Sequence, residues 1–386
     1  MQVERLKKEH YEEFMDLIDF VFCRNLIKVN FEEDMPYIFK EDDEHMSWQY
    51  GCRNEKGKLV AGMGVIPYTY KIGDQTFKVR TITNVATHNR YMGQGYMQRL
   101  FDKVFEDMEA EDVDFVILHG HRERYRFTGF EMAGTSTEAL FRSFNIQSFL
   151  KSGAKLNFTF KKLQDEDIED IRFCKTLFDA EPQHYVRAEK DFMDCARTWQ
   201  GEVYLVLNEK GERVGFFNCC RRFKNPFLRE FLLTCPEKAT EVIYSFMQQQ
   251  NIDSLPVRFS PFDKNLVKNI YAGAEEVTTN QLNRINLLKP ERLLEACLEL
   301  KRQNSGYCPN GKIVIGCKFG NLLIENNNGF SVVKTEEIPD VIIPDKEIYT
   351  LLFGPRSADV DIYADVLKEK SAWFPVPIYI HTTELY

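Results

Sequence analysis

The chain has 386 residues, 44% of them hydrophobic, which is enough for two or three domains that each bury a core. Its 59 acidic residues exceed its 50 basic residues, and the formal charge is −9. This balance argues against nucleic acid as a general partner, because neutralising phosphates requires clustered Lys and Arg.

The ten cysteines are scattered without a CxxC pair, so the sequence predicts neither a zinc ribbon nor a disulfide framework. Residues 1–6 lack the layout of a signal peptide, and no apolar run approaches the roughly 18 residues needed to span a bilayer. We therefore expect a cytoplasmic protein with reduced thiols and no membrane partner.

The N-terminal part reads as a helix followed by strands. Apolar residues at helical spacing predict a helix over 9–22. Strand-like runs over 58–67 and 68–79 are paired, with Gly73-Asp74 as the turn. A further run over 79–86 is rich in β-branched residues and predicts a strand that leads into a glycine-bearing turn.

This turn, Arg90–Gly95, lies between the strand and an amphipathic helix. Gly93 and Gly95 relax the steric limit on φ, and apolar residues from 97 to 108 follow the spacing of one buried helix face. The glycines therefore lie at a helix N-terminus, where free N–H groups, the helix dipole and Arg90 favour a pyrophosphate. The third glycine of GxGxxG would fall at Gln98 and no Gly-Lys-Ser/Thr follows, so neither a dinucleotide fingerprint nor a Walker loop is present.

The string Arg90-x-x-Gly93-x-Gly95 resembles motif A, Q/R-x-x-G-x-G/A, of the GNAT superfamily of acetyl-CoA-dependent N-acetyltransferases. Downstream, residues 114–119 look like the family's next strand, and Tyr125–Phe130 is similar to its tyrosine-then-GF element. The sequence departs from the family at Met92, commonly a second Arg there. The resemblance implies acetyl-CoA as co-substrate, with no metal, held by Thr83, Val85, Arg90, Tyr91, Met92, Gly93, Gln94, Gly95, Tyr96 and His121.

We expect the first domain to cover 1–150, with 135–141 as its last strand. In 151–288 the pattern begins again, with helical stretches to Trp199, strands over 203–208, 214–220 and 227–233, and a helix over 237–249. The segment Thr234–Lys238 takes the place of the glycine turn but has no glycine, and Glu237 would repel a phosphate. We interpret 151–288 as a degenerate acetyltransferase-like domain that does not bind CoA; an unrelated α/β domain is the alternative.

Residues 289–386 predict a smaller α+β domain. A helix over 291–302 is followed by strands over 312–317, 322–325 and 330–333, with Asn328-Gly329 as a hairpin signal, and by a short helix over 343–354. This order resembles the sterol carrier protein-like domain that ends the Eis-type acetyltransferases. The implied fold class is α/β (α+β), with two GNAT-like mixed-sheet domains before a sterol carrier protein-like domain. A lipid carrier role is open, but its apolar residues also fit an ordinary core.

The resemblance also assigns the chemistry. It implies that Tyr125 is the general acid, protonated at neutral pH because a phenol has a pKa of about 10; a packed tyrosine that caps a turn is the alternative. The strand over 79–86 offers no carboxylate as base. In Eis-type enzymes the C-terminal carboxylate, here that of Tyr386, takes this role; a frayed terminus is the alternative. His119 and His121 form an HxH pair, but two histidines make an incomplete metal site.

We therefore expect an N-acetyltransferase that acetylates a primary amine by direct attack in a ternary complex. The acceptor classes implied by the resemblance are aminoglycosides, polyamines and lysine-like amines, and its relatives assemble into rings, so we expect a homo-oligomer such as a hexamer. A non-catalytic acyl-CoA or lipid-binding regulatory protein is the alternative function, and an interaction scaffold is a third.

Overall fold

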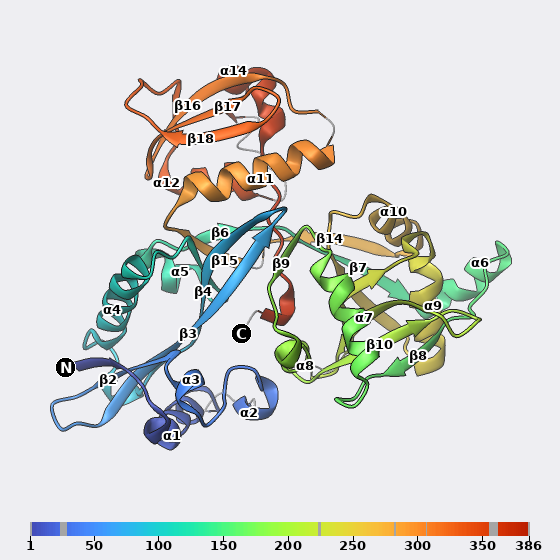
Figure 1. Cartoon of the computed structure of the whole chain (residues 1–386), viewed down its shortest axis with the longest axis horizontal. Coiled ribbons are helices and arrows are strands. Elements are labelled where there is room, and N and C mark those ends of the chain that lie inside the picture. The colour runs from blue at the N-terminus through green and yellow to red at the C-terminus, as the bar shows by residue number, and fades with distance from the viewer. Residues whose placement is uncertain are drawn as a thin grey trace.

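The computed structural model describes residues 2–23, 29–222, 225–281, 283–305, 307–354 and 362–384. Three β-sheets organise this part of the chain (Figure 1). The first two are mixed and stand side by side, and the third is smaller and lies above the first in the view of Figure 1.

The first sheet is built from the N-terminal third together with two later strands. Its strands are, in spatial order, β1 (Gln2–Arg5), β2 (Gln49–Arg53), β3 (Leu59–Ile72), β4 (Gln75–Thr87), β5 (Phe115–Leu118), β15 (Asn283–Leu287) and β6 (Glu131–Ala133), with β9 (Gln183–Tyr185) on β3. The predicted first helix forms as α1 (Tyr11–Phe22) and covers one face, while α4 (Tyr96–Ala110) covers the other. Both helices form because their apolar residues line one side.

The second sheet repeats the strand order and strand directions of the first. Its strands are, in spatial order, β8 (Thr159–Lys162), β10 (Gly201–Leu207), β11 (Arg213–Cys220), β12 (Phe227–Leu233), β13 (Ser254–Phe259), β7 (Ser136–Arg142) and β14 (Glu276–Asn280). In both sheets the fourth and fifth strands are parallel and the next two are antiparallel to their neighbours. The strands predicted over 203–208, 214–220 and 227–233, and the helix α9 (Ala239–Gln250), are confirmed.

The prediction that 135–141 is the last strand of the first domain is wrong. This segment forms β7, which pairs with β13 and β14 in the second sheet, and β15 takes the corresponding place in the first sheet. The range 1–150 therefore contributes one strand, β7, to the second sheet, and the range 151–288 contributes two, β9 and β15, to the first. An alternating apolar pattern determines which face of a strand is buried, but it does not determine which other strand pairs with it.

The third sheet contains β16 (Gly311–Cys317), β17 (Gly320–Asn326), β18 (Phe330–Lys334) and β19 (Val341–Ile342). The helix α11 (Pro290–Ser305) packs on β18, and α12 (Asp345–Phe353) packs beside β6 of the first sheet. The predicted hairpin at Asn328-Gly329 is confirmed by the pairing of β17 with β18. The likeness of this domain to sterol carrier proteins stays a prediction.

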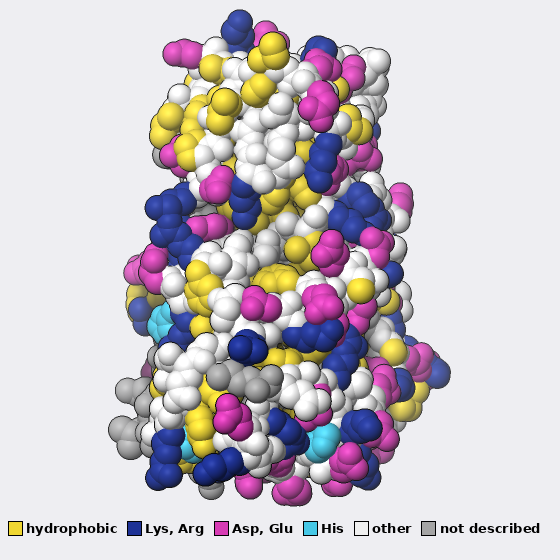
Figure 2. All heavy atoms as spheres, turned by 90° about the vertical axis from the view of Figure 1, so that its left-hand side faces the viewer, with side chains coloured by type: hydrophobic (Ala, Val, Ile, Leu, Met, Phe, Trp, Pro, Cys, Tyr) yellow, Lys and Arg dark blue, Asp and Glu magenta, His cyan; other side chains and the backbone are white. Residues whose placement is uncertain are grey.

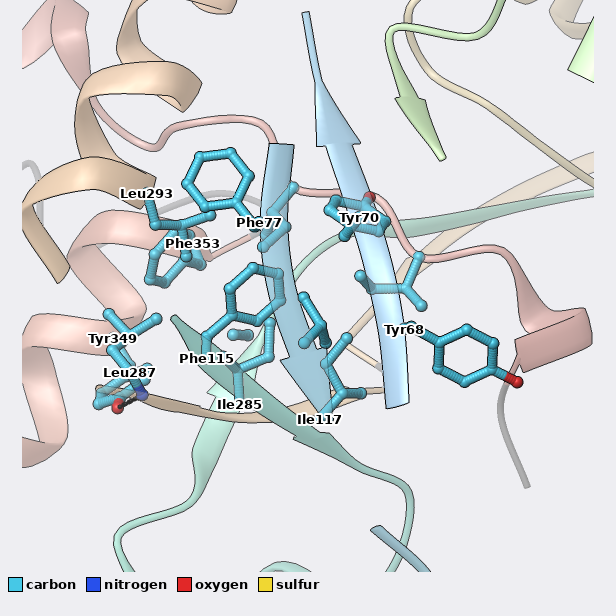
Figure 3. Close-up of a cluster of buried hydrophobic side chains, with 14 of the residues drawn as sticks. Tyr68, Tyr70, Phe77, Phe115, Ile117, Ile285, Leu287, Leu293, Tyr349 and Phe353 are labelled. Atoms are coloured by element: carbon cyan, nitrogen blue, oxygen red, sulfur yellow. Dashed lines mark hydrogen bonds between the residues drawn. The ribbon is translucent and has the colours of Figure 1, made fainter. Parts of the chain in front are cut away.

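One hydrophobic core joins the first sheet to the third part of the chain. Phe115 and Ile285, from β5 and β15, lie near Leu293 of α11 and Tyr349 and Phe353 of α12 (Figure 3). The Leu287 amide, at the end of β15, donates to the Tyr349 hydroxyl at 3.2 Å. Because the same buried cluster includes residues from both parts, the third part is packed on the first sheet rather than tethered to it.

The described C-terminal tail, 375–384, runs between the first two sheets (Figure 1). The Gln183 side chain, in β9, donates to the Pro377 carbonyl at 2.9 Å and accepts from the Tyr379 amide at 2.6 Å. The Thr135 amide donates to the Ile378 carbonyl at 3.1 Å. The tail is therefore held as an integral part of the fold. Within the described residues, no helix has both the length and the apolar character to cross a membrane.

Candidate active site

The predicted glycine turn lies at the N-terminus of α4, with its backbone open. Gly93 and Gly95 have φ values of 74° and 82°, which glycine adopts without the steric cost of a side chain. Gly95 is the N-cap of α4, and a Cβ atom at either glycine would meet nothing within 4 Å. Tyr96, the first helical residue, is buried and anchors the helix start. The first N–H groups of a 15-residue helix thus face open space.

A cleft of about 550 Å³ opens at this turn. Six of the predicted cofactor residues line it: Val85, Tyr91, Met92, Gly93, Gly95 and Tyr96. Its other walls are supplied by Val21, Phe22, Thr87, Met97, Gln98, Arg124 and Phe127. A helix N-terminus and a long cleft together fit a ligand with a diphosphate and an extended arm.

Four of the predicted cofactor residues do not line this cleft. Arg90 and Gln94 are exposed beside the turn, and the Gln94 side chain donates to the Arg90 carbonyl at 3.1 Å. His121 is exposed at the N-cap of α5 (Arg122–Tyr125). Thr83 is buried in β4, on the strand that leads to the cleft.

A β-bulge in β4 separates the part of the strand that pairs with both β3 and β5 from the part beside the cleft, which pairs with β3 alone. Asn84 has a φ of 50°, and the register against β3 shifts so that Gly62 faces Ala86 while Gly64 faces Thr83. The parallel pairing of β4 with β5 ends at Ile82, just before the bulge. Sequence reasoning missed Asn84, although an Asn inside a β-branched run is a usable signal, because Asn tolerates left-handed backbone and is rare in strands.

Three polar groups at the bulge are buried without a hydrogen-bond partner among the described residues. They are the Asn84 side-chain amide nitrogen, the Thr83 hydroxyl and the Gln49 side-chain oxygen. Thr83 and Gln49 approach each other beside Gly64, where a Cβ would come within 2.8 Å and 2.9 Å of them. Buried polar groups are almost always satisfied, so the bulge is suited to a ligand or water that supplies the missing partners.

Tyr125 lies in α5, and its side chain is buried. Its ring packs 6.1 Å from that of Phe101 on α4, and a Cβ at Gly120 would clash with it at 2.7 Å. Burial raises the pKa of the phenol, and the neighbouring Arg124 guanidinium offsets part of this rise. The phenol therefore remains protonated at neutral pH and keeps a proton to donate.

Arg124 is a cleft residue that the sequence did not predict to bind the cofactor. It is exposed and lines the cleft, whereas Met92, which replaces the expected second Arg, lines the same cleft as an apolar side chain. The sequence around Arg124 gave no sign that this residue lies at the cleft. Arg124 precedes Tyr125, and the position of this segment beside the glycine turn depends on how α5 packs against α4. On the face of the molecule that carries α4, positive and negative side chains are interspersed (Figure 2).

The last described residues dock on the second sheet at a buried ion pair. The Arg187 guanidinium donates to the Glu230 carboxylate, and both side chains are at most 1% exposed. The Thr383 hydroxyl accepts from Arg187 at 2.7 Å and donates to Glu230. Burial raises the pKa of Glu230, but the charge of Arg187 outweighs it and holds this pKa below its usual value. Tyr386, the predicted base, lies outside the described residues.

The described residues contain no group of three or more His, Cys, Asp or Glu side chains that could hold a metal ion. His119 and His121 do not form such a group.

Comparison with known proteins identifies the first domain. Residues 2–133 match the family model described as acetyltransferase (GNAT) domain. This range contains α1, β1–β6, the glycine turn and Tyr125. No curated protein matches the chain in a sequence comparison.

Solved structures resemble the whole chain. A probable N-acyltransferase from Enterococcus faecalis superposes with a TM-score of 0.71 at 13% identity, over 100% of this chain and 99% of that one. A GCN5-related N-acetyltransferase from Anabaena variabilis has a TM-score of 0.70 at 15% identity, over 100% of both chains. Eis1 from Mycobacterium abscessus has a TM-score of 0.64 at 12% identity, again over 100% of both. At these identities the likeness concerns the fold, which is a mixed α/β fold with GNAT-like sheets.

Proposed function

We propose that this protein, whose first domain is an acetyltransferase (GNAT) domain, transfers the acetyl group of acetyl-CoA to a primary amine. The observation that carries the proposal is the open glycine turn at the start of α4. This turn lines a cleft of about 550 Å³, which lies next to the bulge at Asn84. A turn of this kind binds a diphosphate through backbone N–H groups. The thioester supplies the electrophilic carbonyl, and the protein supplies position and proton transfer.

In this proposal, residues of the cleft and the buried neighbours Thr83 and Tyr125, which do not line it, have separate roles. The backbone from Met92 to Tyr96 holds the diphosphate through the N–H groups that follow Met92, whose own N–H donates to the Asn89 carbonyl at 3.4 Å. Arg124 adds a cation in place of the family's second Arg, which is Met92 here. The backbone of Thr83 and Val85 borders the cofactor arm. Tyr125, kept neutral by burial, donates a proton to the departing thiolate.

The acceptor enters, in this proposal, on the face of the first sheet opposite α4. Residues 29–47 run along this side and contain seven acidic residues against one lysine. Tyr37 stacks on Tyr68 with centroids 5.8 Å apart and lies 5.5 Å from Trp48. Carboxylates and aromatic faces both attract ammonium groups, so the acceptor is a cationic amine such as an aminoglycoside, a polyamine or a lysine-like side chain.

The amine must lose a proton, and no carboxylate is present in β4 to accept it. We assign this role to the terminal carboxylate of Tyr386. The support is that the preceding residues, up to Thr383, are fixed between the first two sheets by Gln183, Arg187 and Glu230. Attack is then direct, in a complex that holds both substrates.

The test is the release of free CoA thiol from acetyl-CoA in the presence of a panel of primary amines. We expect amine-dependent turnover with at least one polyamine or aminoglycoside, and a strongly reduced rate when one residue is appended after Tyr386. Absence of thiol release with every amine, together with no calorimetric binding of CoA, would refute the function. Unchanged turnover after the extension would refute only the role of the carboxylate.

A further inference from the structure

A second cavity, of about 310 Å³, lies where all three parts of the chain meet. Its walls come from the link between β6 and β7, the segment before α10 (Lys264–Gly273), the C-terminal half of α11 and the tail over 375–378. It shares no lining residue with the cleft at the glycine turn. Neither the acetyltransferase reaction nor the core packing accounts for it.

Most of the wall is apolar. Phe262 lines the cavity, and so do Val376 and Ile378 of the tail, together with the prolines at 375 and 377. Such a surface favours the apolar body of a ligand, because burying apolar area is favourable in proportion to the area removed from water.

The polar groups that reach the cavity are hydrogen-bond donors with positive or neutral charge. Lys301 and Lys264 line it, and none of the described residues that line it is acidic. The Lys301 ammonium donates to the Pro375 carbonyl at 2.9 Å and has no ion-pair partner among the described residues. Asn304 also lines the cavity, and its side-chain amide nitrogen is buried without a hydrogen-bond partner among the described residues.

Lys301 is poorly solvated for a cation. Burial lowers its pKa to about 8, so at neutral pH the charged form carries a desolvation cost that an anion would relieve. The nearest acidic residue in sequence to the wall, Asp263, is engaged elsewhere: its carboxylate caps α10 by accepting from the amides of Asn265 and Leu266 at 2.9 Å and 3.1 Å. Among the described residues, the wall therefore supplies no carboxylate to pair with Lys301.

We propose that this cavity binds a monocarboxylate with an apolar body, the carboxylate lying between Lys301 and Asn304 and the body on Phe262, Val376 and Ile378. The ammonium and the amide supply charge-assisted and neutral hydrogen bonds to the two carboxylate oxygens. Lys264, at the exposed rim, attracts the anion at longer range. The proposal does not rest on acetyltransferase activity.

Ligand binding is expected to act on the tail. Val376 and Ile378 line the cavity, and the same segment is hydrogen-bonded to the Gln183 side chain and to the Thr135 amide. A bound carboxylate therefore adds contacts to the segment that leads to Thr383, and the tail should open less often.

The experiment uses the full chain and decanoate as the probe, with calorimetry for affinity and hydrogen exchange for the tail. We expect saturable binding of decanoate, and slower amide exchange over 376–380 when it is bound. Decylamine and decanol match its chain length with a positive or neutral head group, and we expect each to bind at least about tenfold more weakly.

Three variants locate the site. Lys301→Met keeps the apolar stem and should weaken decanoate binding at least about tenfold, and Asn304→Asp, which adds a like charge, should weaken it similarly. The control is Lys312→Met, on an exposed lysine 3.3 Å from Glu337, which should leave binding unchanged. Equal binding of decylamine, undiminished binding by both site variants, or no binding of decanoate would each overturn the proposal. If Lys301→Met does not fold, it will lack a cooperative unfolding transition. In that case the decanoate affinity of Asn304→Asp decides whether the site is placed correctly.

Discussion

Asn84 and Glu230 occupy equivalent positions in the first two sheets. Each is a non-glycine residue with a φ of 50° at a bulge in the fourth strand, where the register against the third strand shifts by one residue. The bulge at Asn84 leaves buried polar groups without partners among the described residues, beside the cleft at the glycine turn. The bulge at Glu230 is instead occupied by the chain's own tail through Thr383. In the repeated fold one bulge therefore borders a cleft, and the other holds the described tail.

The glycine turn should bind CoA only while its backbone stays open. Gly95→Ala adds a Cβ at a φ of 82°, which costs about 1 kcal/mol of stability, and places a methyl group in the cleft. We expect the dissociation constant for CoA, measured by calorimetry, to rise more than about tenfold. Gly211→Ala is the matched control, because Gly211 has a φ of 77° and also faces open space; it should cost similar stability without affecting CoA. Equal CoA affinity in both variants would remove the turn from the site.

Tyr125 should matter for turnover and not for cofactor binding. Tyr125→Phe keeps the packing on Phe101 but removes the proton, so we expect kcat to fall by about 100-fold, with the dissociation constant of CoA unchanged. The measurement is steady-state thiol release combined with calorimetry. Tyr244→Phe removes a remote hydroxyl, which donates to the Gly273 carbonyl at 2.9 Å, and should leave kcat unchanged. A fully active Tyr125→Phe enzyme would refute the assignment.

The ion pair under the tail should be a major source of stability. Glu230→Gln removes the buried carboxylate charge that pairs with Arg187, and we expect the free energy of unfolding to fall by about 3 kcal/mol. Thermal or urea unfolding measures this loss, and limited proteolysis of the tail should accelerate. Glu189→Gln is the control, since Glu189 pairs with Arg172 on the surface at 2.8 Å, and should change little. A stable Glu230→Gln variant with a protected tail would contradict the anchoring role.

His381 should make the docked tail sensitive to acid. Burial lowers its pKa to about 3, from about 6.5 in the unfolded chain, with Glu230 raising it and Arg187 and His184 lowering it further. The folded state therefore resists protonation. The contribution of the neutral His381 imidazole to the free energy of unfolding is complete above pH 6.5 and is lost as the pH falls from 6.5 towards 3. In His381→Phe, which keeps the ring contacts with Phe178 and Tyr379, the decline in unfolding free energy over this range should be smaller. Parallel pH profiles would show that His381 titrates normally.

Local sequence signals predicted the elements of the cofactor site. The β-branched run before the turn, the two glycines and the apolar stripe of α4 each reflect constraints on a few neighbouring residues. The six predicted residues that line the cleft were named through the resemblance of this turn to the GNAT motif. Arg124 and Asn84 were not named as site residues. Their roles depend on how α5 packs on α4 and on a register shift against β3, which no short pattern encodes.

The sequence by itself determined where helices and strands form and where the backbone of the glycine turn can open, because propensity, periodicity and φ restrictions act over a few residues. Only the tertiary structure decided that β7 and β15 change sheets and that the tail crosses from Gln183 to Glu230. These pairings join residues far apart in the chain, and the partner is chosen by the complementarity of whole buried surfaces rather than by the segment itself.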